Sequence, residues 1–186
     1  MRSIQFISFL LSLFLLSSCN SDDADDTTAD SDVPIRVDIN DNRLNIFEDS
    51  KLTFAILNTE NSGTNGIGTF SLSTGGNIDN IVYGLSAGIT GQNFWKLDLG
   101  DGLAFRTSGT LGEGGFIVVG SLVKDDGVTA VDEASTSEDV VITLTKLDLD
   151  KKVVSGTFSF SAVGATSMET YEVSNGQFTD IPLIIQ

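Results

Sequence analysis

The chain has 186 residues and a formal net charge of −16 at pH 7, with 26 acidic and 10 basic residues. It contains no histidine and a single cysteine, Cys19, so an intrachain disulfide and the usual His or Cys sites for transition metals are excluded. The acidic balance and the lack of a basic stripe with interleaved aromatic residues exclude nucleic-acid binding.

The first 18 residues have the pattern of a lipoprotein signal peptide. Arg2 supplies the positive start, and an apolar stretch runs from Ile4 to Leu16. A membrane-spanning helix needs about 20 apolar residues, so this stretch favours cleavage. Residues 16–19, Leu-Ser-Ser-Cys, resemble the bacterial lipobox, in which the cysteine is lipidated. The resemblance implies acyl chains such as palmitate on Cys19; a plain signal peptide with a stray cysteine is the alternative.

Residues 19–32 predict a lipidated cysteine followed by a disordered, Asp-rich tether. Six aspartates and no basic or large apolar side chain lie in this segment, so it cannot bury enough surface to offset its ordering entropy. Its start, Ser21-Asp22-Asp23, resembles the export tag of Bacteroidota-type surface lipoproteins. That resemblance implies an outer-membrane protein that is lipid-anchored and faces the cell exterior; a generic solvated tether is the alternative.

Residues 33–186 are expected to form one β domain. They keep nine basic and twenty acidic residues, a formal charge of −11. Short alternating apolar runs between Gly, Asn and Asp clusters predict an all-β fold, a single antiparallel β-sandwich or barrel-like domain, with a jelly roll as one arrangement. The predicted strands lie near 34–39, 51–57, 66–73, 79–85, 93–99, 102–107, 115–123, 139–148, 152–162, 169–174 and 177–184.

Clusters of glycine, asparagine and aspartate predict the turns between these strands. Asn175-Gly176 is the strongest hairpin signal, because Asn-Gly suits a two-residue turn. Gly75-Gly76-Asn77 predicts a second turn, and residues 84–88 predict a glycine-flanked turn. Further turns are predicted at Asn61-Ser62-Gly63, Gly100-Asp101-Gly102, Gly112-Glu113-Gly114-Gly115 and Asp125-Asp126-Gly127.

The C-terminal third carries a second resemblance. Residues 155–160 read Ser-Gly-Thr-Phe-Ser-Phe, and residues 175–181 read Asn-Gly-Gln-Phe-Thr-Asp-Ile. Together with Leu144 to Asp148 before them, these segments are similar to a Bacteroidota family of domain-of-unknown-function lipoproteins. The resemblance lies within residues 140–184 and implies a lipid-anchored β domain, without an assigned activity.

No catalytic set is predicted. Residues 84–88, Gly-Leu-Ser-Ala-Gly, match the nucleophile-elbow pattern, but the chain has no histidine to accept the serine proton and no predicted helix follows. Paired carboxylates could serve glycan hydrolysis, but no spacing in the sequence places two acids at working distance. We therefore expect a protein that is not an enzyme, with a carboxylate-based glycan hydrolase as the least favoured alternative.

Aromatic side chains are the candidates for stacking on a sugar. Trp95 alternates in phase with Leu97, which predicts that Trp95 lies in the core and that Phe94 points outward. An outward Phe94 would offer its ring face to a ligand. Tyr83 and Tyr171 are the further candidates for ligand binding.

Calcium is the cofactor that these residue types best allow, because it takes hard oxygen ligands. Asp38, Asn40 and Asp41 resemble part of the calcium linker of cadherins, but the proline and aromatic residue that follow in that motif are missing. An Asx-rich turn is the alternative. The acid-rich segment 125–139 lacks calcium-loop spacing and predicts a solvated loop. No other cofactor is expected.

These features together predict a surface-exposed, lipid-anchored, non-catalytic binding module. Its expected partners are the membrane, through Cys19, and a glycan or a partner outer-membrane protein. A calcium-stabilised structural or adhesive module of the cell envelope is the alternative.

Overall fold

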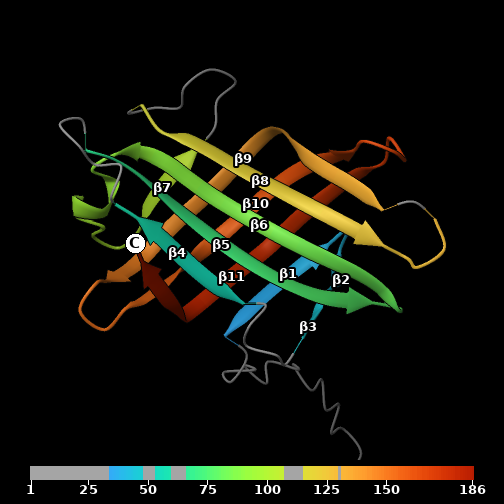
Figure 1. The fold of residues 1–186 in the computed structure, drawn as a ribbon, viewed down its shortest axis with the longest axis horizontal. Coiled ribbons are helices and arrows are strands. Elements are labelled where there is room, and N and C mark those ends of the chain that lie inside the picture. Colours follow the sequence, from blue (N-terminus) through green and yellow to red (C-terminus); the bar gives the residue numbers. More distant parts are fainter. Residues whose placement is uncertain (1–33, 48–52, 60–65, 107–114, 130) are drawn as a thin grey trace, which may run out of the picture. The chain divides into compact units, whose positions relative to one another are not determined.

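The computed structural model describes residues 34–47, 53–59, 66–106, 115–129 and 131–186, with backbone alone at 136–138 (Figure 1). These residues form strands and one 3₁₀ helix, so the all-β prediction is confirmed. The elements are β1 (Ile35–Ile39), β2 (Asn42–Arg43), β3 (Asn45–Ile46), β4 (Phe54–Asn58), β5 (Ile67–Ile78), β6 (Ile81–Gln92), η3 (Phe94–Lys96), β7 (Leu103–Arg106), β8 (Ile117–Asp125), β9 (Asp132–Asp148), β10 (Val153–Gly164) and β11 (Thr170–Ile185).

The main strands form a closed ring of hydrogen bonds. The ring runs β4-β5-β6-β8-β9-β10-β11, and β11 pairs back onto β4. Each strand is antiparallel to the next, so an odd number of strands forces the closing pair to be parallel, as β11 and β4 are. β1 pairs with β11, β2 with β1, β3 with β5, and β7 with β9. Because consecutive strands are neighbours, the sheet is a meander and the jelly-roll arrangement does not apply.

The closed sheet is flattened into two layers whose strands cross (Figure 1). One layer contains β4, β5, β6 and β8, and the other contains β9, β10 and β11 with β1 beside them. The layers join at two corners, where Ser121–Lys124 of β8 pairs with Asp132–Ser135 of β9 and where β4 meets β11. Residues 33–186 thus make one compact unit.

Two tight turns, at Asn40-Asp41 and at Asp79-Asn80, are made by Asn and Asp rather than by glycine. Asp79 and Asn80 connect β5 to β6 with φ of 49° and 72°, and Ile78 pairs directly with Ile81 across the turn. Two consecutive residues with positive φ are what a type I′ hairpin requires, and Asn and Asp tolerate that conformation. The turn predicted at Gly75-Gly76-Asn77 is wrong, because β5 continues through it to Ile78.

The Asn175-Gly176 pair does not form the predicted hairpin. β11 runs unbroken through it, so the predicted strands 169–174 and 177–184 are one strand. Both neighbours of β11 shift register here: Phe158 and Phe160 of β10 face Gly176 and Val173, so β11 carries one extra residue. Asn175 takes a φ of 51° at this point. The pair is therefore a β-bulge, which bends the strand instead of reversing it.

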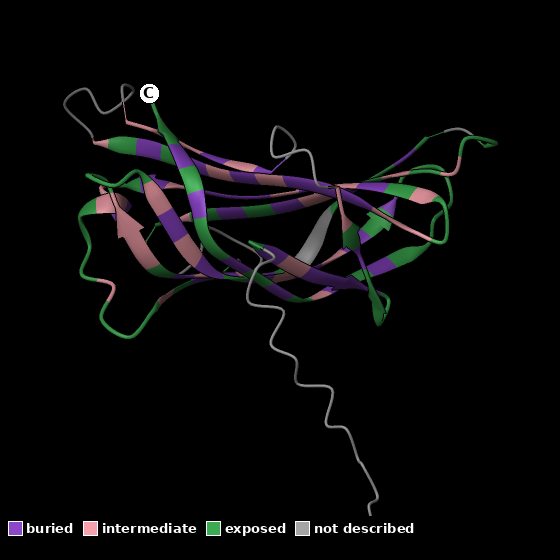
Figure 2. Ribbon diagram, turned by 90° about the horizontal axis from the view of Figure 1, so that it is seen from below, coloured by how far each residue is buried: buried purple, intermediate pink, exposed green. Residues whose placement is uncertain are grey.

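The core lies between the layers, and burial follows a period of two along β4, β8 and β10 (Figure 2). On β10, Val154, Phe158, Phe160 and Ala162 are buried, as the alternation predicts. Phe178 of β11 joins the two layers, with its ring 6.5 Å from Phe70 of β5 and 6.3 Å from Phe158. Such aromatic pairs add to the stabilisation from buried area.

The prediction of a strand at residues 93–99 is wrong. Asn93 has a φ of 52°, and the chain then enters the short helix η3. This turn points Phe94 inward, where it is fully buried against Phe105, while Leu97 is 42% exposed. Trp95 is only partly buried. The prediction that Phe94 points outward, with Leu97 in the core, fails because the period of two holds only while the backbone stays extended.

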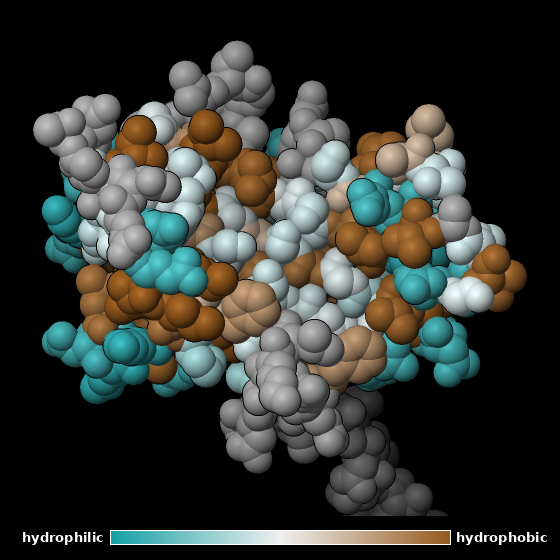
Figure 3. Space-filling view, viewed as in Figure 1, coloured by the Kyte–Doolittle hydropathy of each residue, from teal (hydrophilic) through white to brown (hydrophobic). Residues whose placement is uncertain are grey.

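The outer face of the layer β4-β5-β6-β8 is rich in small and apolar side chains (Figure 3). Ile117 and Val119 of β8 are about half exposed there. A hollow of about 580 Å³ on this layer contains Gly75 and Gly84, which pair directly across β5 and β6. This face contrasts with the polar outer face of the other layer.

Candidate functional site

A polar hollow of about 510 Å³ lies on the outer face of the layer formed by β9, β10, β11 and β1. We call it the arginine hollow, because two of the three arginines of residues 33–186 line it. Among the described residues that line it, none is acidic. Its lining consists of Arg36, Arg43, Val141, Thr157, Phe158, Ser159, Asn175, Gly176 and Gln177.

Strand register brings the main polar side chains of this hollow together. Arg36 of β1 lies directly opposite Gln177 of β11, and Gln177 lies opposite Thr157 of β10. Residues directly opposite each other share a face of the sheet, and neighbouring strands are about 4.8 Å apart. The three side chains therefore form one row across three strands, on the side away from the core.

The bulge in β11 shapes the floor of the arginine hollow. Gly176 follows the bulged Asn175, and Phe158 of β10 leaves no room for a side chain at this position. A Cβ atom at Gly176 would overlap the carbonyl oxygen of Phe158 and come within 2.8 Å of its ring. Because bulges bend a strand and redirect its side chains, the Asn-Gly pair aims the side chain of Asn175 toward Asp38 of β1.

A buried carboxylate anchors one side of the hollow. Asp38 is only 8% exposed, forms an ion pair with Arg43, and accepts a 2.8 Å hydrogen bond from the side-chain amide of Asn175. The hydrogen bond from Arg43 lowers the pKa of Asp38 against the opposing effect of burial, and the bond from Asn175 and the charge of Arg36 lower it further. Asp38 therefore stays ionised and fixes the orientation of Arg43.

The remaining polar groups of the hollow are available to a ligand. Within the described part of the chain, the guanidinium of Arg36 has no hydrogen-bond or ion-pair partner, and neither do the side chains of Thr157, Ser159 and Gln177. Together they offer several donors and acceptors, and no histidine is present to move a proton. This arrangement suits the binding of a polar ligand.

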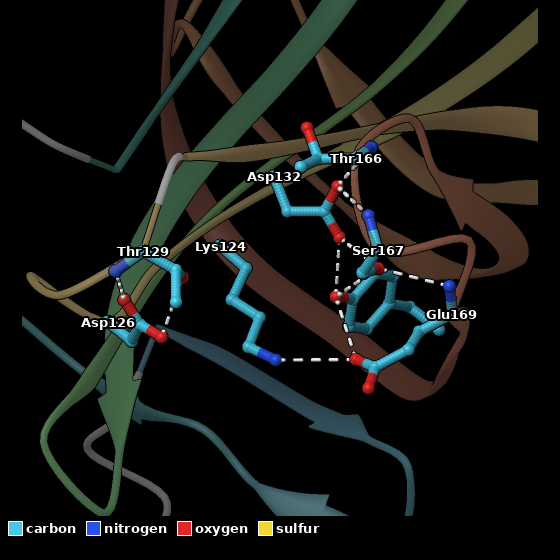
Figure 4. Close-up of polar contacts among 8 residues, drawn as sticks. Lys124, Asp126, Thr129, Asp132, Thr166, Ser167 and Glu169 are labelled. Atoms are coloured by element: carbon cyan, nitrogen blue, oxygen red, sulfur yellow. Dashed lines mark hydrogen bonds and ion pairs between the residues drawn. The ribbon is translucent and has the colours of Figure 1, made fainter.

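A second polar cluster joins the start of β9 to the turn between β10 and β11 (Figure 4). Asp132, 5% exposed, accepts hydrogen bonds from the Thr166 N–H at 2.9 Å, from the Ser167 hydroxyl and N–H, and from the Tyr171 hydroxyl at 2.7 Å. The bond from Ser167, followed by those from Thr166 and Tyr171, holds the pKa of Asp132 far below its ordinary value. Both carboxylate oxygens of Asp132 thus accept hydrogen bonds, and the side chain has a structural role: it links the start of β9 to the turn between β10 and β11.

Lys124 of β8 closes the other side of this cluster. Its ammonium lies 3.4 Å from a carboxylate oxygen of Glu169 and 5.7 Å from the centre of the Tyr171 ring. Burial alone would lower the pKa of Lys124, but the neighbouring Tyr171 and Glu169 outweigh it and raise the pKa. Lys124 thus remains a cation and stays paired with Glu169.

Asp132→Asn should lower the melting temperature at neutral pH and leave little effect in acid. The folded-state pKa of Asp132 is depressed, so its stabilising contribution is fully present above the unfolded value of about 3.9 and is lost as the pH falls through the folded value. We therefore expect the difference in melting temperature between wild type and variant to be constant from pH 5 to pH 7 and to narrow steadily below about pH 4. Thermal melts followed by circular dichroism measure it.

Asp150→Asn, a change in an exposed turn between β9 and β10, serves as the control and should match wild type throughout. A difference for Asp132→Asn that stays constant down to pH 2 would contradict a depressed pKa.

The three candidate aromatics lie inside the protein. The exposed fraction is 0% for Phe94, 8% for Tyr83 and 2% for Tyr171. Burial raises the pKa of both tyrosines, and the hydroxyl of Tyr171 is engaged with Asp132. The structure brings none of these rings together with the arginine hollow, and Tyr83 instead lines the hollow on the layer β4-β5-β6-β8.

The candidate calcium ligands lie in and beside the β1–β2 turn. Asn40 and Asp41 have φ of 48° and 63°, and the side-chain oxygen of Asn40 accepts the Glu172 N–H at 2.8 Å. Asp38 is held by Arg43 and Asn175 as described. Among the described residues, no three acidic side chains are grouped so that they could hold a metal ion. The placement fits an Asx-rich hairpin.

Other predicted features have mixed outcomes. Residues 84–88 lie inside β6 rather than in a turn, and the hydroxyl groups of Ser86 and Ser121 form a hydrogen bond of 2.8 Å.

Several predicted features lie outside the described residues: Cys19, the signal peptide, the tether and the turns predicted at 61–63 and 112–114. Sequence reasoning missed the arginine hollow, although the alternation along residues 153–162 indicates that Thr157 and Ser159 share the polar face of a strand.

In the described ranges, no helix has the length and apolar character needed to cross a membrane. Comparison of the chain with protein families, with curated proteins and with solved structures finds no match.

Proposed function

We propose that this protein is a surface-exposed, lipid-anchored binding module without catalytic activity, and that it holds a glycan in the arginine hollow. The observation that carries the proposal is the row of unengaged polar side chains, Arg36, Gln177 and Thr157, across β1, β11 and β10. Sugar hydroxyls are both donors and acceptors, so a concave surface of guanidinium, amide and hydroxyl groups can match them.

The rigid frame supports a binding role. The hollow lies on paired strands, and its shape is set by the bulge at Asn175 and by the buried Asp38. A site held by packed strands loses less conformational entropy when a ligand binds than a site on loops does. The lipobox at residues 16–19 and the acidic tether support display on a membrane, because acyl chains on Cys19 would anchor the protein without a spanning segment.

Glycan binding is tested with the purified full chain in detergent. An array of plant, animal and bacterial oligosaccharides should show binding to at least one class, and isothermal titration should give one site per chain. Gln177→Ala should weaken binding severalfold, because it removes the middle of the polar row, while Thr170→Ala on the same strand but outside the hollow should not. A folded protein that binds no glycan overturns the proposal.

Cys19→Ala tests the anchor. Each buried methylene of an acyl chain contributes about 0.8 kcal/mol to membrane binding, so loss of the lipidation site should move most of the protein from the membrane fraction to the soluble fraction. Fractionation and immunoblotting measure this, and protease added to intact cells tests exposure. A variant that stays in the membrane fraction would contradict the anchor on Cys19.

A further inference from the structure

We infer that the arginine hollow selects acidic glycans and binds a carboxylate or sulfate group of the ligand between Arg36 and Arg43. This inference rests on the proposed glycan-binding function and names its ligand class. It follows from the distribution of charge, from the pairing of Arg43 and from the geometry of the guanidinium group.

The few arginines of this acidic domain gather on one face. Residues 33–186 carry a formal charge of −11 but contain only three arginines. Arg36 and Arg43 line the hollow, and Arg106 of β7 lies directly opposite Val141 of β9, which also lines it. Opposed residues share a face of the sheet, so all three arginines lie on the same outer surface.

The hollow keeps an unbalanced positive charge. Asp38 neutralises one guanidinium, because it accepts hydrogen bonds from Nε and Nη2 of Arg43, and it also accepts one from the side-chain amide of Asn175. The side chain of Arg43 is still 49% exposed, so its outer edge faces solvent. Arg36 has no hydrogen-bond or ion-pair partner among the described residues, and its charge acts on Asp38 only at longer range. Two guanidinium groups thus face one carboxylate, and the described lining of the hollow adds no acidic side chain.

The chemistry of arginine matches an anionic group better than a neutral sugar. A guanidinium presents parallel N–H donors, which pair with two oxygens of a carboxylate or sulfate. Thr157, Ser159 and Gln177 beside it can bond the ring hydroxyls of the same sugar. The repulsion from distant acids is weak, because the Debye length is about 8 Å at physiological ionic strength, whereas contact pairs are much less screened.

The test compares oligosaccharides of equal length that are uronic-acid-based, sulfated or neutral, titrated against the purified full chain in detergent. We expect tighter binding of at least one acidic class, and an affinity that falls as NaCl rises from 50 to 500 mM. Arg36→Gln should weaken acidic-glycan binding about tenfold or more, since a charge-assisted hydrogen-bond pair is lost. Arg36→Lys should give an intermediate loss, because lysine keeps the charge but not the fork.

Two further variants make the result specific. Lys151→Gln removes the same charge from a side chain that is 75% exposed at the β9–β10 turn, outside the hollow, and should bind like wild type. Gln177→Glu adds a carboxylate directly opposite Arg36, on an exposed position that should leave the fold intact, and should abolish binding of acidic glycans. Circular dichroism and melting temperature verify folding.

Each outcome decides the matter. Preference for the uronic acid, for the sulfated sugar or for both supports the inference and identifies the anion. Equal affinity for neutral and acidic oligosaccharides, or an unchanged affinity in folded Arg36→Gln and Gln177→Glu, overturns the acidic preference and leaves the proposed glycan binding in place. Binding of no glycan by the folded chain overturns both.

Discussion

Phe178→Ala should lower the free energy of unfolding by about 3–5 kcal/mol, the largest loss that we expect from one side chain. Phe178 is 1% exposed and lies between the layers, with its ring near Phe70 of β5 and Phe158 of β10. Truncation removes buried apolar area and leaves a cavity that closed, hydrogen-bonded strands cannot collapse to fill. The midpoint of thermal unfolding should fall on the order of 10 °C.

Ile184→Ala provides a control on the same strand. Ile184 points outward and is 48% exposed, so its truncation should change stability by about 0.5 kcal/mol. Urea titrations of both variants measure the free energies. If the two variants lost similar amounts, Phe178 would not connect the layers as described.

Gly156→Ala should destabilise the protein by about 3 kcal/mol, although it adds only one methyl group. A Cβ atom at this position in β10 would overlap the backbone carbonyl oxygen of Thr143 in β9 and lie 2.7 Å from Cζ of Phe178. A backbone oxygen in a paired strand cannot move aside without disturbing the β9–β10 ladder. A small local movement therefore cannot relieve the strain.

Gly84→Ala tests whether the effect is steric rather than a general property of glycine in strands. Gly84 also lies mid-strand, but a Cβ atom there would meet only Val123, at 4.0 Å. Since alanine loses less backbone entropy on folding, this variant should match or exceed wild type by about 0.4–1 kcal/mol. Equal destabilisation by both substitutions would rule out the steric explanation for Gly156.

The strand pattern of β10 could be predicted because it depends on neighbouring residues alone. Successive side chains of an extended chain point to opposite faces, so the burial of Phe158 and Phe160 and the outward position of Thr157 follow from their spacing. The same rule failed for Phe94, because Asn93 adopts positive φ and ends the extended conformation. Asparagine is compatible with both the extended and the positive-φ conformation, so the presence of Asn93 alone does not show where the strand ends.

The candidate site depended on contacts that are distant in sequence. Asn175-Gly176 suits a turn or a bulge equally well, since both need a residue with positive φ. Strands β10 and β1, which pair with β11 on either side, select the bulge. Likewise, Arg36 lies in one row with Thr157 only because of the register of three strands, and no local sequence pattern encodes that register.

The parallel closure between β4 and β11 has a consequence for how the chain acquires its structure. Hairpins such as β5–β6 join adjacent segments and can form early, whereas the pairing of Ala55 with Leu183 requires segments from opposite ends of the domain to meet. Until that encounter, β4 and β11 each present an unpaired edge, the kind of surface on which chains aggregate. The domain should therefore be most prone to aggregation before its last strand has paired with β4.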